Sequence, residues 1–521
     1  MQVNRQIHFN KKIPLLIFVI CFTVFLFTSD GHRYTFDEDV SFQQSYRIAT
    51  FENDPSYVQG ESKVFFEYPW LFPPEHNTRP ICQNGILCSG AFIFHSITQV
   101  PFIFLNHTFN FISDDDVIWN IDDFDDFHYL NWRNSLSGDF TFLELFYGPV
   151  FMSLSVGVFF LVSRTYSFST KTSTMLSLLF GFTTSIWAYS QTSLNIVPAT
   201  FFILLGFYFF RKFLLTTSYY GLLFSGIVLG FGFLVRNDTV LFIIPMFGFL
   251  IFNWLKNSNK IRNALSIMLL FALPLTISYI IRHQLRVLVS SDSSLGYNAT
   301  AQFAKNQPVL LNAFGMLFSP GVGLLIFCPI LLTIFFSYYD FFKKNKPECI
   351  LFISFILIWL FVHGTTDSWH GLNGWSERYL TMLIPFLLLP LGFSIEKRAS
   401  KKFYSILIGL ASLGVIFNLA YLLTDVSWFI WGIMGSGKGL YELGHITQHI
   451  WVHPLVLWTF DYSQLTHAIR YALIDLHPDI FLLKIWGLAF YSIFSIISIS
   501  LMTLYLIYLN KNSVKSLNKL S

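Results

Sequence analysis

The chain has 521 residues, of which 54% are hydrophobic, 19% are aromatic and only 12% are charged. Soluble domains carry roughly 25% charged residues, so this composition excludes a soluble globular protein and predicts an all-α protein that crosses the membrane many times. The net charge of +3 at pH 7 says little by itself, and no nucleic-acid partner is expected.

Twelve apolar stretches come close to the ~17–25 residues that a helix needs to cross a bilayer. The first has no small-residue cleavage site at its end, so we expect a retained first helix rather than a removed signal peptide. The predicted spans are 13–29, 139–163, 174–189, 195–210, 218–235, 239–255, 263–281, 309–337, 349–363, 379–395, 403–423 and 480–508.

The basic residues predict how these helices are oriented, because Lys and Arg collect on the cytoplasmic side of membrane proteins. With the N-terminus inside, the inner segments hold most of the Lys and Arg residues but only Asp340, Glu348 and Glu396 among the acids. We therefore expect one multi-pass domain, 1–521, in the cell (plasma) membrane. Its function is expected on the outer face, in the large outer segments that are given by residues 30–138 and 424–479.

The first outer segment contains an apolar stretch, 91–105, that is short and interrupted by Pro101. Its length predicts an interfacial or re-entrant helix rather than a span. Cys82 and Cys88 lie in the same segment, where they could form a disulfide in an oxidising compartment or remain two free thiols.

Three consecutive acids, Asp37, Glu38 and Asp39, follow the first predicted span. A carboxylate just outside the membrane can serve as a general base towards a hydroxyl acceptor, or can hold a metal ion against a phosphate. Acids in this position are also often plain solvated charge at a helix exit. The three residues alone leave both interpretations open.

Arginines lie at the outer ends of later predicted spans, on the same side of the membrane as the three acids. Arg236 lies in a very short outer turn between two spans, and Arg282, Arg286 and Arg378 occupy similar positions. A planar guanidinium suits a diphosphate or phosphodiester group. Anchoring of the side chain at the membrane interface would give the same pattern.

Two outer features suggest a site that faces the arginines. Pro320, Gly321 and Gly323 interrupt a predicted span, and broken backbone at membrane depth is tolerated where it is buried in protein or lines a cavity. The loop 363–378 is dense in hydrogen-bonding and ring side chains, among them Trp369, His370, Trp375 and Glu377. Trp faces stack on sugar rings, although interfacial aromatic belts have the same composition.

Several motifs together resemble the polyprenyl-phosphate-dependent glycosyltransferases of the GT-C superfamily. The closer resemblance is to the prokaryotic protein O-mannosyltransferase-like group (glycosyltransferase family 39), and it runs from about residue 13 to about residue 395. The motifs are "FGFTTSIWAYSQTSLNIVPATFFILLGFY", "GIVLGFGFLVRNDTVLFIIP", "SLGYNA", "GMLFSPGVGLLIFCPILL" and "SWHGLNGWSERYLTMLIPFLLLPL".

This resemblance implies a GT-C-type bundle of about twelve transmembrane helices with interfacial helices in the first outer loop. It also implies inverting transfer of a sugar from a polyprenyl-phosphate donor to a protein, lipid or glycan acceptor, with Asp37 or Glu38 as general base. A family-like "GGWSFGPRYL" pattern becomes "NGWSERYL" here, with Glu377 in place of a small residue or Pro. The implied donor-phosphate ligands are Arg236, Arg378 and Arg282, and the implied sugar or acceptor pocket comprises Tyr189, Asn195, Trp369, His370, Trp375 and Tyr379.

A divalent metal ion is a further possible cofactor under the same resemblance. His445, His449 and His453 are spaced four residues apart, which would place them on one face of a helix as metal ligands or as part of an interfacial surface. The sequence does not identify the sugar, the acceptor or the oligomeric state.

Two other classes of membrane protein remain as alternatives. A secondary transporter or lipid flippase would carry ionisable residues at mid-membrane and repeated halves, whereas Glu144 is the nearest approach to such a residue. A non-catalytic scaffold or sensor would be insensitive to substitution of Asp37 and Glu38.

Overall fold

A computed structural model describes residues 12–33, 35, 38, 41, 42, 45, 46, 48, 49, 93–112, 141–256, 265–289, 308–366, 369–371, 374–397, 400–424, 453–474 and 478–517. Every regular element in this part of the chain is helical, which confirms the all-α prediction. The elements are α1 (Lys12–Phe27), α4 (Ile93–Phe109), α6 (Phe142–Thr165), α7 (Thr170–Phe182), α8 (Ile186–Tyr189), α9 (Ile196–Thr216), α10 (Tyr219–Val235), η3 (Asn237–Thr239), α11 (Val240–Lys256), η4 (Ile267–Ala272), α13 (Leu273–Val289), α14 (Val309–Phe318), α15 (Leu324–Phe327), η5 (Pro329–Thr333), α16 (Ile334–Lys344), α17 (Lys346–Gly364), η6 (Arg378–Leu383), α18 (Ile384–Leu388), α19 (Leu391–Lys397), α20 (Lys401–Leu422), α22 (Pro454–Trp458), α23 (Gln464–Ile474) and α24 (Phe481–Leu517).

Eight helices of the described residues are long and apolar enough to cross a membrane, so the prediction of a polytopic membrane protein is confirmed. The predicted number of twelve membrane spans is not confirmed. The first and fifth predicted spans are shorter apolar helices, α1 and α10. The eight candidates are Phe142–Thr165, Ile196–Thr216, Asn237–Leu255, Ile267–Gln284, Lys346–Gly364, Arg378–Lys397, Lys401–Leu422 and Phe481–Tyr508.

The predicted span 309–337 is broken into α14, α15, η5 and α16 at the Pro320–Gly323 turn. The backbone N–H of Gly321 donates to Leu457 O in α22 at 3.1 Å. A Cβ on Gly321 would lie 2.2 Å from Val456 O, so only glycine allows the turn to approach α22 this closely. The interruption expected from the sequence is therefore real, and α22 packs into it.

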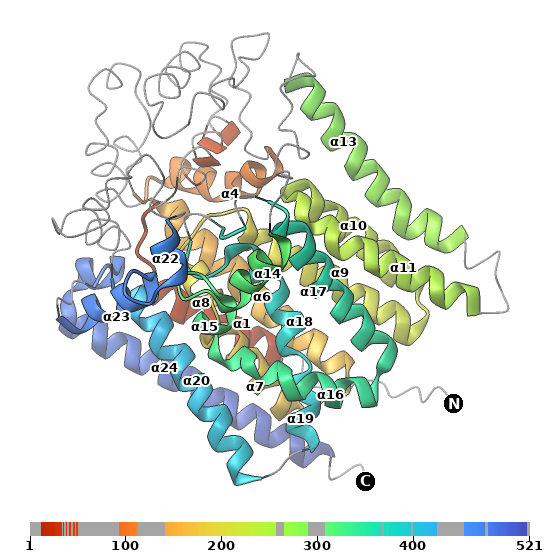
Figure 1. Ribbon diagram of the computed structural model, residues 1–521. Helices are drawn as coiled ribbons and strands as arrows, with labels where there is room; N and C mark the ends of the chain where they lie inside the picture. Colours follow the sequence, from red (N-terminus) through yellow and green to blue (C-terminus); the bar gives the residue numbers. More distant parts are fainter. Residues whose placement is uncertain are drawn as a thin grey trace.

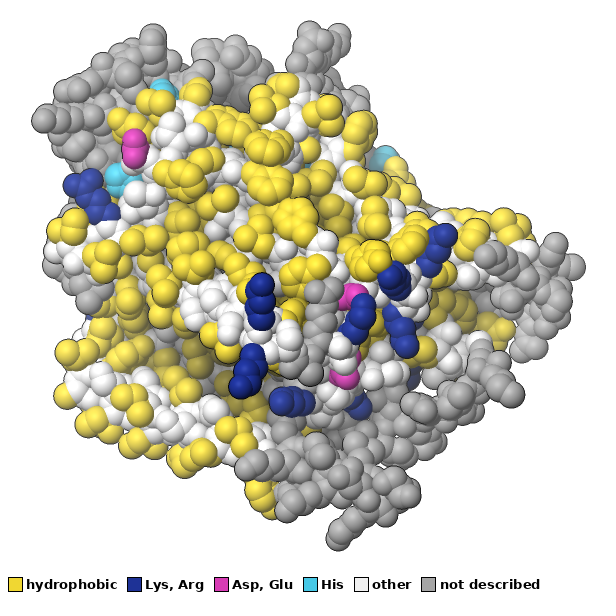
Figure 2. Space-filling view, turned by 60° about the horizontal axis from the view of Figure 1, so that its bottom comes forward, with side chains coloured by type: hydrophobic (Ala, Val, Ile, Leu, Met, Phe, Trp, Pro, Cys, Tyr) yellow, Lys and Arg dark blue, Asp and Glu magenta, His cyan; other side chains and the backbone are white. Residues whose placement is uncertain are grey.

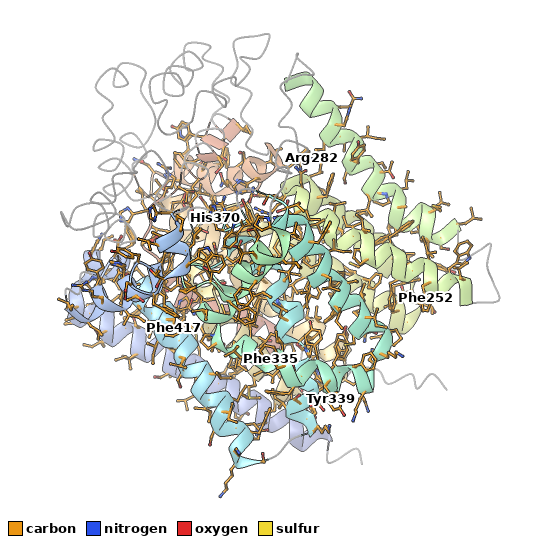
Figure 3. The ribbon with its side chains drawn as sticks, in the orientation of Figure 1. Phe252, Arg282, Phe335, Tyr339, His370 and Phe417 are labelled. Atoms are coloured by element: carbon orange, nitrogen blue, oxygen red, sulfur yellow. The ribbon has the colours of Figure 1, made fainter. Side chains whose placement is uncertain are left out.

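The core of the bundle is formed around α6, which packs against α1 and α9. The outer helices α13 and α24 lie at opposite edges of the view in Figure 1. They expose rows of Leu, Ile and Phe side chains, as expected where a helix faces lipid rather than protein. Figure 3 shows three such exposed aromatic side chains on the flank of the bundle, Phe252, Phe335 and Tyr339.

The two ends of the bundle differ in charge. Figure 1 shows α4 lying across one end, and α16 and α19 reaching the other. Figure 2 views that second end, where Lys and Arg side chains gather with few acids among them. The exposed lysines of the α16–α17 and α19–α20 connections are Lys343, Lys344, Lys346, Lys397, Lys401 and Lys402. This asymmetry agrees with the cytoplasmic assignment, which stays a prediction.

Candidate functional site

The site is best described from Glu38, whose side chain is fully buried. Glu38 Oε2 accepts hydrogen bonds from the backbone N–H and the hydroxyl of Thr35, each at 3.0 Å. Glu38 Oε1 accepts the backbone N–H of Ser193 at 3.1 Å. These bonds hold the carboxylate in one orientation and tie the first outer segment to the connection between α8 and α9.

Ser193 joins three parts of the chain that are distant in sequence. Its hydroxyl donates to Glu144 Oε1 in the first turn of α6 at 2.8 Å. Its carbonyl oxygen lies 2.8 Å from His95 Nε2 and accepts from Gln99 Nε2 at 3.1 Å, and both of these side chains come from α4. The α8–α9 connection is thus bonded to the segment of the three acids, to α4 and to α6.

The predicted interfacial stretch is indeed a helix, α4, and it contributes directly to this arrangement. Ser45 donates to Gln99 Oε1 at 2.6 Å, so the segment that follows Glu38 is attached to α4. Thr98 lies 2.6 Å from the hydroxyl of Tyr147 in α6. These polar contacts fix α4 across the end of the bundle, whereas its interfacial location stays a prediction.

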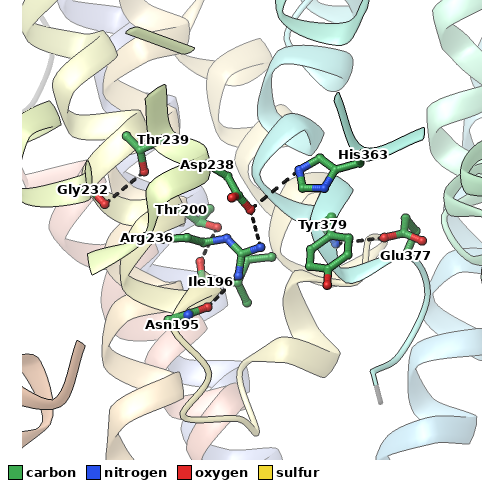
Figure 4. Close-up of polar contacts among 10 residues, drawn as sticks. All are labelled: Asn195, Ile196, Thr200, Gly232, Arg236, Asp238, Thr239, His363, Glu377 and Tyr379. Atoms are coloured by element: carbon green, nitrogen blue, oxygen red, sulfur yellow. Dashed lines mark hydrogen bonds and ion pairs between the residues drawn. The ribbon is translucent and has the colours of Figure 1, made fainter. Parts of the chain in front are cut away.

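The same α8–α9 connection also holds Arg236, through Asn195, which lies two residues after Ser193. Arg236 Nη1 donates to Asn195 Oδ1 at 2.6 Å, and Arg236 Nη2 forms an ion pair with Asp238 Oδ2 at 2.5 Å (Figure 4). Arg236 has an extended backbone because it ends α10, and Asp238 belongs to the short helix η3 that follows. Asp238 Oδ2 lies 3.7 Å from His363 Nε2.

Two arginines meet at the ring of Tyr379. The guanidinium carbons of Arg236 and Arg378 lie 5.3 Å and 5.4 Å from the ring centroid. The imidazole of His363 stacks on the same ring at 4.7 Å, with an interplanar angle of 14°. Since Arg378 and Tyr379 are only half-buried, this cluster of two guanidinium groups around one ring is suited to bind a phosphate.

Arg282, the third predicted phosphate ligand, lies close by but has a different set of contacts. Its Nη1 donates to the carbonyl oxygens of Phe233 and Leu234 at 2.8 Å and 2.9 Å. These carbonyls belong to the last turn of α10, where a cation satisfies otherwise unpaired groups. Figure 3 shows Arg282 towards the same end of the bundle as His370. Its role in phosphate binding stays a prediction.

The aromatic residues predicted to form a pocket fall into two groups. Tyr189 lies beside the Arg378 segment, because a Cβ on Gly374 would be 2.9 Å from the Tyr189 hydroxyl and 3.4 Å from Arg378 Cβ. The Trp375 ring lies 4.8 Å from Phe327 and 4.7 Å from Tyr421. Both side chains are buried.

Trp369 and His370 form the second group, with ring centroids 5.6 Å apart. The Trp369 ring packs over Gly315 of α14, and it lies 5.8 Å from Trp458 of α22. Contacts of this kind are typical of packing between elements. Their part in a sugar pocket stays a prediction.

Several predicted residues lie outside the described part of the chain: Asp37, Asp39, Cys82, Cys88, His445 and His449. The described member of the histidine series, His453, accepts a hydrogen bond from the backbone N–H of Leu455 and so caps α22. Among the described residues, no group of three or more His, Cys, Asp or Glu side chains could hold a metal ion. The metal site therefore stays a prediction.

Sequence reasoning did not identify Ser193, His95 and Gln99 as site residues. Ser, His and Gln at single positions carry no pattern, and only the fold brings them together. Glu144 could have been identified as a site residue from the sequence, since an acid inside an apolar span indicates function by default. Asp238 could also have been identified from the sequence, because it directly follows Arg236 and Asn237 in the short turn between two predicted spans.

One comparison with known proteins, a match to a family model, agrees with this description. Residues 134–279 match the family model described as dolichyl-phosphate-mannose-protein mannosyltransferase. The match confirms the resemblance to GT-C glycosyltransferases over a segment that contains Glu144, Ser193, Asn195 and Arg236. It supports a membrane glycosyltransferase.

No curated protein sequence matches the chain. Among solved structures, the chain is similar to the crystal structure of ArnT from Cupriavidus metallidurans in the apo state, with a TM-score of 0.44 and 11% sequence identity over 92% of this chain and 87% of that one.

Proposed function

We propose that this chain is a GT-C membrane glycosyltransferase that transfers a sugar from a polyprenyl-phosphate donor to a protein, lipid or glycan acceptor on the extracytoplasmic face. One observation carries the proposal. Within the segment that matches the mannosyltransferase family, Ser193 bonds to Glu38 and Asn195 bonds to Arg236. A carboxylate and a guanidinium are therefore held by the same short connection.

The two halves of the reaction need these two kinds of group. A carboxylate accepts the proton of the acceptor hydroxyl as its oxygen attacks the anomeric carbon of the sugar. The bond between that carbon and the phosphate oxygen breaks, and polyprenyl phosphate leaves with the electron pair. Attack on the face opposite the leaving group inverts the anomeric configuration, and nearby cations stabilise the released phosphate.

Between the two adjacent acids, we assign the base to Asp37 and an anchoring role to Glu38. Glu38 is fully buried, and its carboxylate oxygens already accept three hydrogen bonds from Thr35 and Ser193. Hydrogen bonds to the ionised form lower the basicity of a carboxylate. A general base needs a free lone pair within reach of the acceptor, which the bonding of Glu38 disfavours.

Arg236 and Arg378 are proposed to bind the donor phosphate. Both guanidinium groups lie next to Tyr379, and Asn195 and Asp238 hold Arg236 in a fixed orientation before any ligand arrives. A preorganised cation costs little reorganisation when charge develops on the leaving group.

The proposal places the protein in the cell membrane with a cytoplasmic N-terminus and an extracytoplasmic site. The exposed lysines lie at the end of the bundle opposite α4. Lys and Arg favour the cytoplasmic side, so α4 and the residues bonded to Ser193 would face outward.

A direct test uses purified full-length protein with radiolabelled dolichyl phosphate mannose and measures release of dolichyl phosphate in the presence of membrane extract as acceptor source. We expect Asp37→Asn to lower release by roughly 10²–10⁴-fold, the typical contribution of a general base. Glu38→Gln should also lower release, through misplacement of the segment. Wild-type release that equals that of both variants would refute the function.

A further inference from the structure

Buried polar atoms without partners gather next to the two arginines. Among the described residues, buried Glu377 Oε2 and Trp375 Nε1 have no hydrogen-bond partner, and the buried hydroxyls of Tyr189 and Thr381 bond only to each other. Such atoms are rare in folded proteins because each costs roughly 1–3 kcal/mol. A polar ligand that reached this place would satisfy these atoms.

Three of these groups are close neighbours. The surroundings of the Tyr189 hydroxyl include Arg378, Glu377 and Thr381. On the other side, a Cβ on Gly371 would lie 3.0 Å from Arg378 Cγ and 3.1 Å from Glu377 Oε1. The stem of Arg378 therefore lies close to the side chains of both Tyr189 and Glu377.

The backbone of this loop is bent to direct Glu377 inward. Gly371 and Ser376 both have left-handed backbone conformations, with φ of 72° and 62°. The strained Ser376 directly precedes Glu377, and strain of this kind is concentrated at ligand sites. Glu377 Oε1 then accepts the backbone N–H of Tyr379 at 3.2 Å, which leaves Oε2 for another partner.

The position of Glu377 disfavours the charged form of its carboxyl group. Burial raises the pKa of its carboxyl group well above the usual range, and this effect exceeds the opposing effects of the Tyr379 N–H and the charges of Arg378 and Arg236. A protonated carboxyl group can donate a hydrogen bond, as can the hydroxyls of Tyr189 and Thr381. The groups match the oxygen atoms of an uncharged ligand.

We infer that Tyr189, Glu377 and Thr381 form a subsite that binds the hydroxyl groups of an uncharged sugar, with Glu377 as the specificity-determining residue. The inference rests on the proposed function and names its substrate class: the sugar carried by the lipid phosphate that Arg236 and Arg378 bind. Glu377 is also a residue at which this chain departs from the sequence pattern that it resembles.

The test compares two lipids on the purified full-length protein: dolichyl phosphate mannose and dolichyl phosphate, which lacks the sugar. Variants are Tyr189→Phe, Glu377→Leu and Glu377→Gln, and Tyr404→Phe in α20 is the matched control for loss of a hydroxyl. We expect Tyr189→Phe and Glu377→Leu each to weaken binding of dolichyl phosphate mannose roughly three- to tenfold, as for loss of one hydrogen bond. Binding of dolichyl phosphate should not change.

Glu377→Gln keeps a neutral hydrogen-bond donor and should retain most of the affinity for the mannose lipid. Equal weakening for both lipids in Tyr189→Phe, or no weakening in either variant, would overturn the subsite and leave the proposed function standing. Wild-type protein that binds the two lipids equally well would overturn it in the same way. Wild-type protein that binds neither lipid would overturn both proposals.

Discussion

Glu38 and Glu144 accept hydrogen bonds from the same residue, Ser193, at 3.1 Å and 2.8 Å. One bond comes from the backbone N–H and the other from the hydroxyl, and both carboxylates are fully buried. Two buried acids that share one donor residue must move together. The segment of the three acids is thereby linked to the first turn of α6 and to the loop that holds Arg236.

The Ser193 hydroxyl should matter for stability. Ser193→Ala removes the hydrogen bond to Glu144 and leaves the backbone bond to Glu38 in place, so we expect a loss of about 1–3 kcal/mol, the cost of an unsatisfied buried acceptor. The loss of stability is measured as a decrease in the melting temperature of the purified protein. Ser153→Ala is the control, since the Ser153 hydroxyl is equally buried in α6 and has no hydrogen-bond partner in the part of the chain that the structure describes. Equal melting temperatures for the two variants would contradict a stabilising Ser193–Glu144 bond.

Arg236 and Arg282 should respond differently to substitution. Arg236→Lys loses the fork that contacts Asn195 and Asp238, and we expect at least about tenfold weaker binding of dolichyl phosphate. Arg282→Ala removes a cap from α10, so it should lower the melting temperature more than the affinity. Equilibrium binding and thermal unfolding of both variants separate the two roles, and an Arg282→Ala variant with the larger loss of affinity would reverse the assignment.

The pair of His32 and Asp479 predicts a pH dependence of stability. His32 Nε2 lies 3.3 Å from Asp479 Oδ1. Burial alone would lower the pKa of His32, but the hydrogen bond and charge of Asp479 raise it above 6.5. Burial likewise opposes ionisation of Asp479, whose pKa is nevertheless lowered below 3.8 by His32 and Lys484.

The signs follow from linkage. The His32 contribution is fully present below pH 6.5 and is lost as the pH rises through the raised pKa. The Asp479 contribution is present above pH 3.8 and is lost as the pH falls through the lowered pKa. We expect the melting temperature of wild type to exceed that of His32→Asn most at pH 5–6 and less at pH 9. A difference that grows towards pH 9 would contradict the pairing.

Two glycines of α20 form a matched pair for the packing of the bundle. A Cβ on Gly414 would lie 2.4 Å from Thr183 O, whereas Gly409 has nothing within 4 Å. Small residues allow such close approach between membrane helices. We expect Gly414→Ala to destabilise by about 1–3 kcal/mol and Gly409→Ala to be neutral or stabilising by up to about 1 kcal/mol. Thermal unfolding of both variants measures the two effects. A larger loss of stability in Gly409→Ala than in Gly414→Ala would refute the close contact at Gly414.

Composition and hydropathy were enough to predict a polytopic helical fold, because lipid exposure demands long apolar helices. They were less reliable for the number of spans. The stretch 174–189 contains two helices, since α7 ends at Phe182 and α8 begins at Ile186. Hydropathy averages over such a break, and the backbone groups released there are satisfied by contacts that hydropathy does not report.

The site was predictable where side-chain chemistry is distinctive. Arg236, Arg378, Tyr379 and Asn195 were named from the sequence, and the structure brings them together. Ser193 was not, because its role depends on a backbone N–H and a carbonyl oxygen that any residue provides. Glu377 was noticed as one polar side chain of an outer loop and as a departure from a pattern, and its burial gives that departure a physical meaning.

The most direct test of the central claim is mass spectrometry of glycans and lipid-linked sugars in cells that lack this chain and are complemented with wild type or with the Asp37→Asn, Glu38→Gln double variant. We predict that wild type restores a hexose- or pentose-bearing product, and that cells with the double variant lack this product and accumulate the sugar-loaded polyprenyl phosphate. Restoration of the same product by the double variant would contradict a glycosyltransferase that relies on these carboxylates.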